Sequence, residues 1–72
     1  MIFPNPTKSI INVKSENSIK SIQLYDVQGR LLQTKLTDET SSSIDISDKS
    51  NGIYFLKITS DKGIKVERIV KE

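Results

Sequence analysis

The side chains that could do chemistry in this 72-residue chain are mainly hydroxyls, carboxylates and amines, because histidine and cysteine are both absent. Without them the common nucleophilic triads cannot be assembled, and zinc, copper and haem lack their usual ligands. A Ser–Lys dyad could use Ser9 or Ser47 with a nearby lysine. Both serines lie in polar, turn-rich stretches, which favour a solvated hydroxyl or a local backbone bond. We therefore predict a protein that is not an enzyme and binds no cofactor.

Carboxylates offer one remaining route to a metal site, because hard cations such as Ca²⁺ and Mg²⁺ prefer oxygen ligands. The candidate ligands are Asp26, Asp45, Asp48 and Asp61. Asp45 and Asp48 are close in sequence, but their spacing does not match an EF-hand. Turn formation and solubility explain these residues better, so we predict no metal site.

The binding signals are also weak. Eleven basic and nine acidic residues give a net charge of +2, a small excess for a nucleic-acid-binding domain, and no RNP-like aromatic pattern is present. Tyr54 and Phe55 could line a sugar-binding face, but their place in an apolar strand favours core packing. No segment is apolar over the length of a membrane span. We predict no nucleic-acid partner and no membrane span.

The elements that must position these residues are β-strands, since apolar residues alternate along the chain and alanine is absent. The first is Met1 to Phe3, which Pro4-Asn5-Pro6 ends because proline cannot donate to a ladder. Further strands are expected at Ser9–Lys14 and Ile19–Asp26, with a loop over 15–18 between them. The turn Asp26-Val27-Gln28-Gly29 joins the latter to a return strand at Arg30–Leu36, and Gly29 supplies the positive φ of a bulged hairpin.

The second half of the chain continues this pattern. After a polar loop over 37–43, Ser43–Ser47 is a short strand with Ile44 and Ile46 inward. Gly52 opens the next strand, and Ile53–Ser60 is apolar on both faces at its start, which predicts a central strand. Asp61-Lys62-Gly63 is a tight turn before the final strand, Ile64 to Lys71. The three glycines are isolated and serve turns, so they form no phosphate-binding loop: Gly29, Gly52 and Gly63.

About seven short antiparallel strands with frequent turns predict an all-β sandwich or barrel in one domain, residues 1–72. The N-terminus lacks a basic leader with a long apolar run. An export signal, if there is one, must then lie in a longer parent or later in this chain.

Four landmarks, in order along the chain, carry a family likeness. They are Phe3-Pro4-Asn5-Pro6-Thr7, Ile22-Gln23-Leu24-Tyr25-Asp26-Val27-Gln28-Gly29-Arg30, Asn51-Gly52-Ile53-Tyr54-Phe55-Leu56-Lys57-Ile58 and Arg68-Ile69-Val70-Lys71. Their order and spacing resemble the type A C-terminal sorting domain of the type IX secretion system in Bacteroidota.

The resemblance implies a small Ig-like β-sandwich at the end of a larger secreted parent, with Met1 marking the start of an excised piece. It implies a cargo domain before this one, with type IX translocon and sortase components as partners. Cargo passes through the periplasm and the outer membrane to the cell surface or the medium, and a surface sortase commonly removes the domain.

The resemblance also implies recognition residues. Gly52 and Tyr54 match a Gly-x-Tyr element, which we expect to hold the fold together with Pro4-Asn5-Pro6, Gly29 and Gly63. Arg68-Ile69-Val70-Lys71 matches a terminal basic element, in which the family often has lysine at the position of Arg68. We expect Arg68 and Lys71 to be exposed charges that a receptor can pair with.

Two further expectations follow. A terminal strand is often an edge strand, so Ile64–Lys71 could dock by strand addition. The alternative function is a structural, adhesive or carbohydrate-binding Ig-like module of a secreted protein, which the composition and strand pattern fit equally well.

Overall fold

The computed structural model of the protein describes residues 2–4 and 6–72. Within that part of the chain all regular structure is β. The strands are β1 (Ile2–Phe3), β2 (Ile10–Tyr25), β3 (Leu31–Asp45), β4 (Gly52–Ser60) and β5 (Gly63–Lys71). The all-β prediction is confirmed. Five strands are found where about seven short ones were expected, and an Ig-like seven-stranded sandwich is not confirmed.

The difference arises because the predicted loops over residues 15–18 and 37–43 are extended and belong to β2 and β3. The two long strands bend together. Lys14 pairs with Ser41 and Ile19 with Glu39, so that residues 15–18 lie opposite Thr40 alone. Such an irregularity bends a strand pair sharply. A polar, serine-rich segment normally forms a loop. Here pairing with β2 keeps residues 37–43 extended in β3, at an exposed edge of the sheet.

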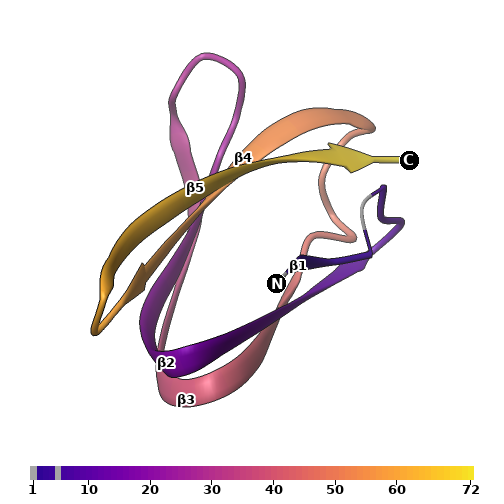
Figure 1. The fold of residues 1–72 in the computed structure, drawn as a ribbon. Coiled ribbons are helices and arrows are strands. Elements are labelled where there is room, and N and C mark those ends of the chain that lie inside the picture. Colours follow the sequence, from indigo (N-terminus) through magenta and orange to yellow (C-terminus); the bar gives the residue numbers. More distant parts are fainter. Residues whose placement is uncertain (1, 5) are drawn as a thin grey trace.

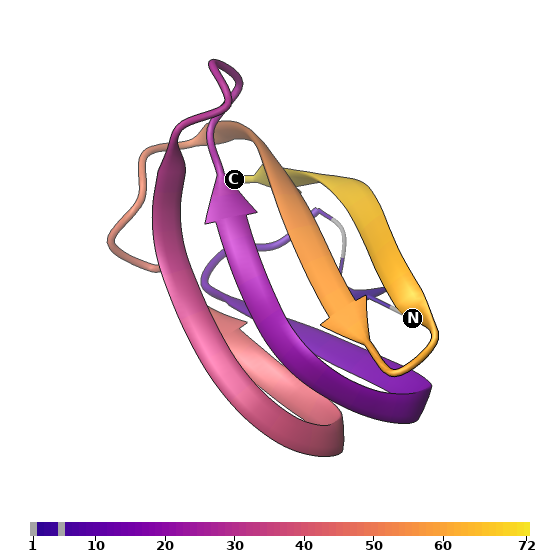
Figure 2. The ribbon, with the colours of Figure 1, turned by 90° about the vertical axis from the view of Figure 1, so that its left-hand side faces the viewer.

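The result is one antiparallel sheet in the order β1-β2-β4-β5, with β3 also paired to β2, curled over on itself (Figures 1 and 2). One half of the curl contains β1, the start of β2 and the end of β3. The other contains the end of β2, the start of β3, β4 and β5. As predicted, β4 is central, because it lies between β2 and β5.

The core lies between the two halves of the curl. One half contributes Ile11, Val13 and Ile44, with Ile46 directly after β3, and the other contributes Ile19, Ile22, Leu24, Tyr54, Leu56, Ile58 and Ile69. The inward placement of Ile44 and Ile46 is confirmed. In β5 the apolar residues lie on both faces: Ile64 and Val66 are 62% and 58% exposed on the outer face, while Ile69 is fully buried on the core face.

Local turn chemistry follows the sequence closely. Gly29 has φ of 83° and donates its N–H to the Asp26 carbonyl at 3.0 Å, closing the predicted hairpin turn. Gly52 begins β4 as expected, and Gly52 and Gly63 also have positive φ. Pro4 follows β1 through a cis peptide bond. Asn5, the middle of the Pro-Asn-Pro landmark, lies outside the described residues, as does Met1.

The chain between β1 and β2 is tied to the end of β5. The N–H of Thr7 donates to the Val70 carbonyl at 2.9 Å, and the N–H of Glu72 donates to the Thr7 carbonyl at 2.8 Å. These bonds form a parallel bridge between Thr7 and Lys71, called the Thr7 bridge below. Thr7 is 2% exposed, and its hydroxyl donates to the Ile10 carbonyl at 3.0 Å. The bridge therefore brings the first and last segments of the curled sheet together.

Candidate functional site

The four residues of the terminal basic element have different environments in β5. Arg68 is exposed, Ile69 is fully buried, Val70 is half-buried and Lys71 is 7% exposed. The alternation of a strand explains this pattern. Ile69 pairs with Tyr54 and Lys71 with Gly52 on the core side, whereas Arg68 pairs with Phe55 on the opposite side. The element therefore exposes Arg68 and part of Val70.

The expectation that Lys71 is an exposed charge is therefore wrong. Lys71 pairs with Gly52 on one side, and the Thr7 bridge covers its other side. A lysine can bury its aliphatic stem along apolar surface while its ammonium group reaches outward. No local pattern indicates this burial, because it depends on contact with Thr7, which lies near the other end of the chain.

Arg68 belongs to a continuous surface on the side of the sheet opposite the core, which we call the outer sheet face. Its cross-strand rows are set by the register, in which Tyr25 pairs with both Leu31 and Phe55, and Phe55 pairs with Arg68. The full set is Ser21, Gln23, Tyr25, Leu31, Thr34, Leu36, Ile53, Phe55, Lys57, Thr59, Ile64, Val66, Arg68 and Val70.

The outer sheet face is apolar and cationic. Leu31, Leu36, Ile53, Ile64 and Val66 are between 40% and 79% exposed. Lys57 and Arg68 are the charged members of the set, which contains no carboxylate. Exposed apolar surface of this kind marks interaction sites, and its charge favours an acidic partner. The core packing expected for Phe55 is wrong, because Phe55 is half-buried on this face.

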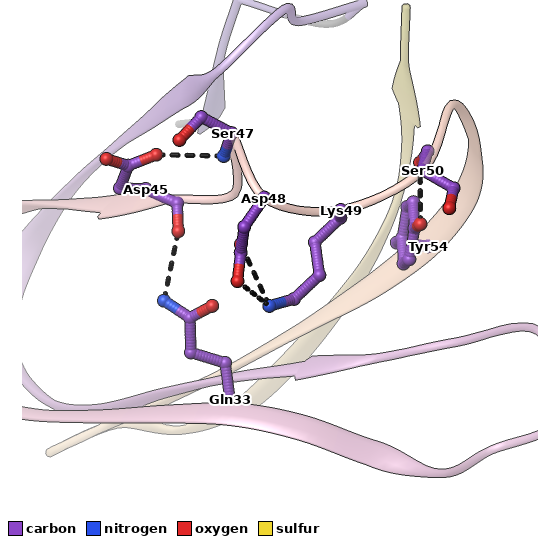
Figure 3. Close-up of polar contacts among 7 residues, drawn as sticks. All are labelled: Gln33, Asp45, Ser47, Asp48, Lys49, Ser50 and Tyr54. Carbon is purple, nitrogen blue, oxygen red and sulfur yellow. Dashed lines mark hydrogen bonds and ion pairs between the residues drawn. The ribbon is translucent and has the colours of Figure 1, made fainter.

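The Gly-x-Tyr element holds the loop between β3 and β4 (Figure 3). Tyr54 is 8% exposed, as expected for a core residue, and its hydroxyl donates to the Ser50 carbonyl at 2.6 Å. Gly52, two residues earlier, has φ of 151°, which disfavours a side chain. Tyr54 thus ties this loop to the core, and Gly52 supplies the positive φ with which β4 begins.

The candidate metal ligands accept hydrogen bonds in turns or pair with lysines. Asp45 accepts the Ser47 N–H at 2.8 Å, and this hydrogen bond lowers the pKa of its carboxyl group. Its backbone carbonyl accepts Gln33 Nε2 at 3.1 Å (Figure 3). Asp48 is paired with Lys49, also in Figure 3, and Asp61 lies 3.6 Å from Lys20 Nζ. Among residues 2–4 and 6–72, no cluster of three or more potential metal-binding side chains is present.

Asp26 organises the turn between β2 and β3. Its Oδ1 accepts the N–H groups of Gln28 at 2.9 Å and Arg30 at 3.0 Å, and its Oδ2 lies 2.6 Å from Arg30 Nε. The Arg30 backbone N–H is the largest influence that lowers the pKa of Asp26. A carboxylate with this many local donors stabilises a turn.

The described residues contain no helix that is long and apolar enough to cross a membrane. Of the residues expected to take part in recognition, the structure places Arg68 and Val70 on one surface with Tyr25 and Phe55. Sequence reasoning missed this surface, although the apolar residues on both faces of β4 were a signal for it. It also missed Thr7.

Comparison with known proteins gives one family. A comparison with curated proteins finds no match. A family model described as a secretion system C-terminal sorting domain matches residues 1–72. The protein therefore belongs to the family of C-terminal sorting domains that serve type IX secretion.

Proposed function

We propose that this domain is a non-catalytic address that directs an attached cargo through the outer membrane by the type IX secretion system. The observation that carries the proposal is the family match over residues 1–72. A type IX sorting signal implies export to the cell surface or the extracellular space. On our proposal the cargo domain precedes residues 1–72 in a larger parent, transits the periplasm, and is released from this domain by a surface sortase.

The outer sheet face is the surface that we assign to the receptor. Arg68 is exposed there, next to the half-buried ring of Phe55 across the strand pair. Arginine surrounded by aromatic and aliphatic side chains is typical of residues that contribute most to protein–protein affinity. A translocon component with an acidic, partly apolar surface would be complementary to this face.

A fusion tests the assignment. Residues 1–72 are placed after a reporter that carries an N-terminal signal peptide, in a type IX-competent host. The reporter is expected at the cell surface or in the medium, and in the periplasm when residues 1–72 are omitted. Retention of the complete fusion in the periplasm would contradict the proposal and favour a purely structural or adhesive module.

The receptor surface is tested in the same fusion. Arg68→Glu reverses a charge on the outer sheet face and is expected to lower export about tenfold or more, in line with the cost of reversing a charge at an interface. Lys8→Glu makes the same charge change at an exposed residue outside that face. Equal export by the two variants would show that the receptor does not contact Arg68.

A further inference from the structure

The free edge of β5 differs between its two ends. Val70 C=O and Glu72 N–H point away from β4, because both bond to Thr7. The β4–β5 register runs without interruption from Gly52↔Lys71 to Ser60↔Gly63. The N–H and C=O groups of successive residues point to opposite edges of a strand. Those of Ile64 and Val66, an even number of residues before Val70, therefore also point away from β4. Within the described residues, the strand neighbours of β5 are β4 and Thr7. The edge is thus covered at its C-terminal end and open at Ile64 and Val66.

A cavity of about 640 Å³ lies next to this open stretch. Apolar side chains of Ile2, Val13 and Ile58 line it, and Ile64 and Lys65 of β5 form part of its wall. It occupies the gap between the β1 side of the curl and the β4–β5 hairpin, whose positions are seen in Figure 2. At the other end of the molecule the Thr7 bridge closes the same gap.

A strand added at Ile64 and Val66 would have apolar contacts on both of its faces. Side chains alternate across a strand, so every second one would point to the cavity. The others would lie beside the side chains of Ile64 and Val66, which are 62% and 58% exposed. Such an added strand would explain why Ile64 and Val66, at the open edge, carry exposed aliphatic side chains.

The charged residues around the rim of the cavity determine which charge an added strand should carry. Lys14, Lys62 and Lys65 line it with one acidic residue, Glu16. Lys65 is paired with Glu67 at 3.1 Å, and Lys14 lies 5.7 Å from the centre of the Phe3 ring. The resulting positive rim favours carboxylates at the ends of an added apolar strand.

We propose that the open edge of β5 and this cavity bind an extended segment of a partner polypeptide, apolar in the middle and acidic at its ends. A second copy of the chain fits less well. β5 carries three basic residues, Lys65, Arg68 and Lys71, and one acidic residue, Glu67, so a second β5 would bring positive charge to the positive rim. The site shares Ile64 and Val66 with the outer sheet face but does not include Arg68, so the peptide titration and the export of Arg68→Glu can fail independently.

The probe is a nine-residue peptide in which valine alternates with threonine between terminal aspartates. It is titrated into the 72-residue protein, and amide hydrogen exchange is followed by NMR. The N–H groups of Ile64 and Val66 are expected to exchange about tenfold more slowly when the peptide is bound. A peptide with lysines in place of the aspartates is expected to bind about threefold to tenfold more weakly.

Val66→Pro removes an outward N–H without removing a bond to β4, so it is expected to abolish binding while the Leu56 N–H stays protected. Val66→Thr keeps the N–H and is the matched control. The peptide is added to about 1 mM, which would detect binding with a dissociation constant as weak as about 1 mM. Unchanged amide exchange at Ile64 and Val66 under these conditions would overturn the proposal. So would equal binding by Val66→Pro and Val66→Thr. Should Val66→Pro unfold, Lys62→Glu decides, because it must weaken the preference for aspartate ends.

Discussion

The carboxylates of Asp26, in the turn before β3, and Asp45, the last residue of β3, make the same local hydrogen bond. Each carboxylate accepts the N–H of the residue two positions later, Gln28 in one case and Ser47 in the other. The bond favours the ionised form, and the pKa of both carboxyl groups is lowered. We therefore expect both turns to lose stability in acid, when these carboxylates become protonated.

The first prediction concerns Asp26→Asn. A lowered pKa in the folded state means that the ionised carboxylate stabilises the fold above the unfolded pKa, about 3.9, and that this contribution is lost as the pH falls through the folded value. The variant should be less stable than wild type at neutral pH, and the difference should shrink below about pH 4. Urea unfolding at several pH values measures it, and Asp45→Asn should show the same trend. A constant difference at every pH would contradict this account.

The second prediction concerns the Tyr54 hydroxyl. Tyr54→Phe removes the bond to the Ser50 carbonyl and should lower the free energy of unfolding by about 0.5–1.5 kcal/mol. Tyr25→Phe removes a longer bond, 3.2 Å to Gln23 Oε1, at the half-buried outer sheet face, and should cost less. Chemical denaturation compares the two variants, and an equal or larger loss for Tyr25→Phe would argue against a special role for the Tyr54 contact.

Residue types alone predicted part of this picture. Asp26 and Gly29 have the side chain and the φ freedom that a hairpin turn requires, so the turn followed from local chemistry. The exposure of Arg68 also matched the expectation. The burial of Lys71 did not, because it is caused by Thr7, which no local pattern connects to the end of the chain.

At the scale of the element, β2 and β3 show that strand boundaries set by long-range pairing cannot be predicted from local sequence. Residues 15–18 and 37–43 are polar enough to suggest loops, yet they lie within strands. Their conformation is set by pairing between β2 and β3 rather than by their own propensity. For the same reason the burial of β5 could not be assigned, since its register against β4 decides which side chains face the core.

The third prediction concerns the Thr7 bridge. Thr7→Pro removes the N–H that bonds to the Val70 carbonyl, and should speed amide exchange at Glu72 by about tenfold. Thr7→Val removes the hydroxyl but keeps this N–H, so exchange at Glu72 should change less. Equal exchange at Glu72 in wild type and Thr7→Pro would show that the end of β5 is held by β4 alone.

At the scale of the whole molecule, a small core holds both halves of the curl together. Leu56 is fully buried in the central strand, and Leu36 is 79% exposed on the outer sheet face. A domain of this size has a limited free energy of unfolding, on the order of 0.05–0.15 kcal/mol per residue. The loss of one large core side chain is therefore a large fraction of the total.

The fourth prediction compares these two leucines. Leu56→Ala should lower the free energy of unfolding by about 2–5 kcal/mol, since it leaves a cavity between the halves of the curl. Leu36→Ala should change it by about 0.5 kcal/mol or less. Urea denaturation measures both, and similar losses would mean that the outer sheet face is covered in the isolated protein.

The Thr7 bridge has a mechanical consequence. The segment around Thr7 and the end of β5 run parallel, so a force that draws these two segments apart along the strand direction slides one past the other. Both hydrogen bonds of the bridge then stretch together, whereas a hairpin pulled open at its end loses its bonds one at a time. We therefore expect the Thr7 bridge to resist a force along the strand direction more strongly than the open end of a hairpin would.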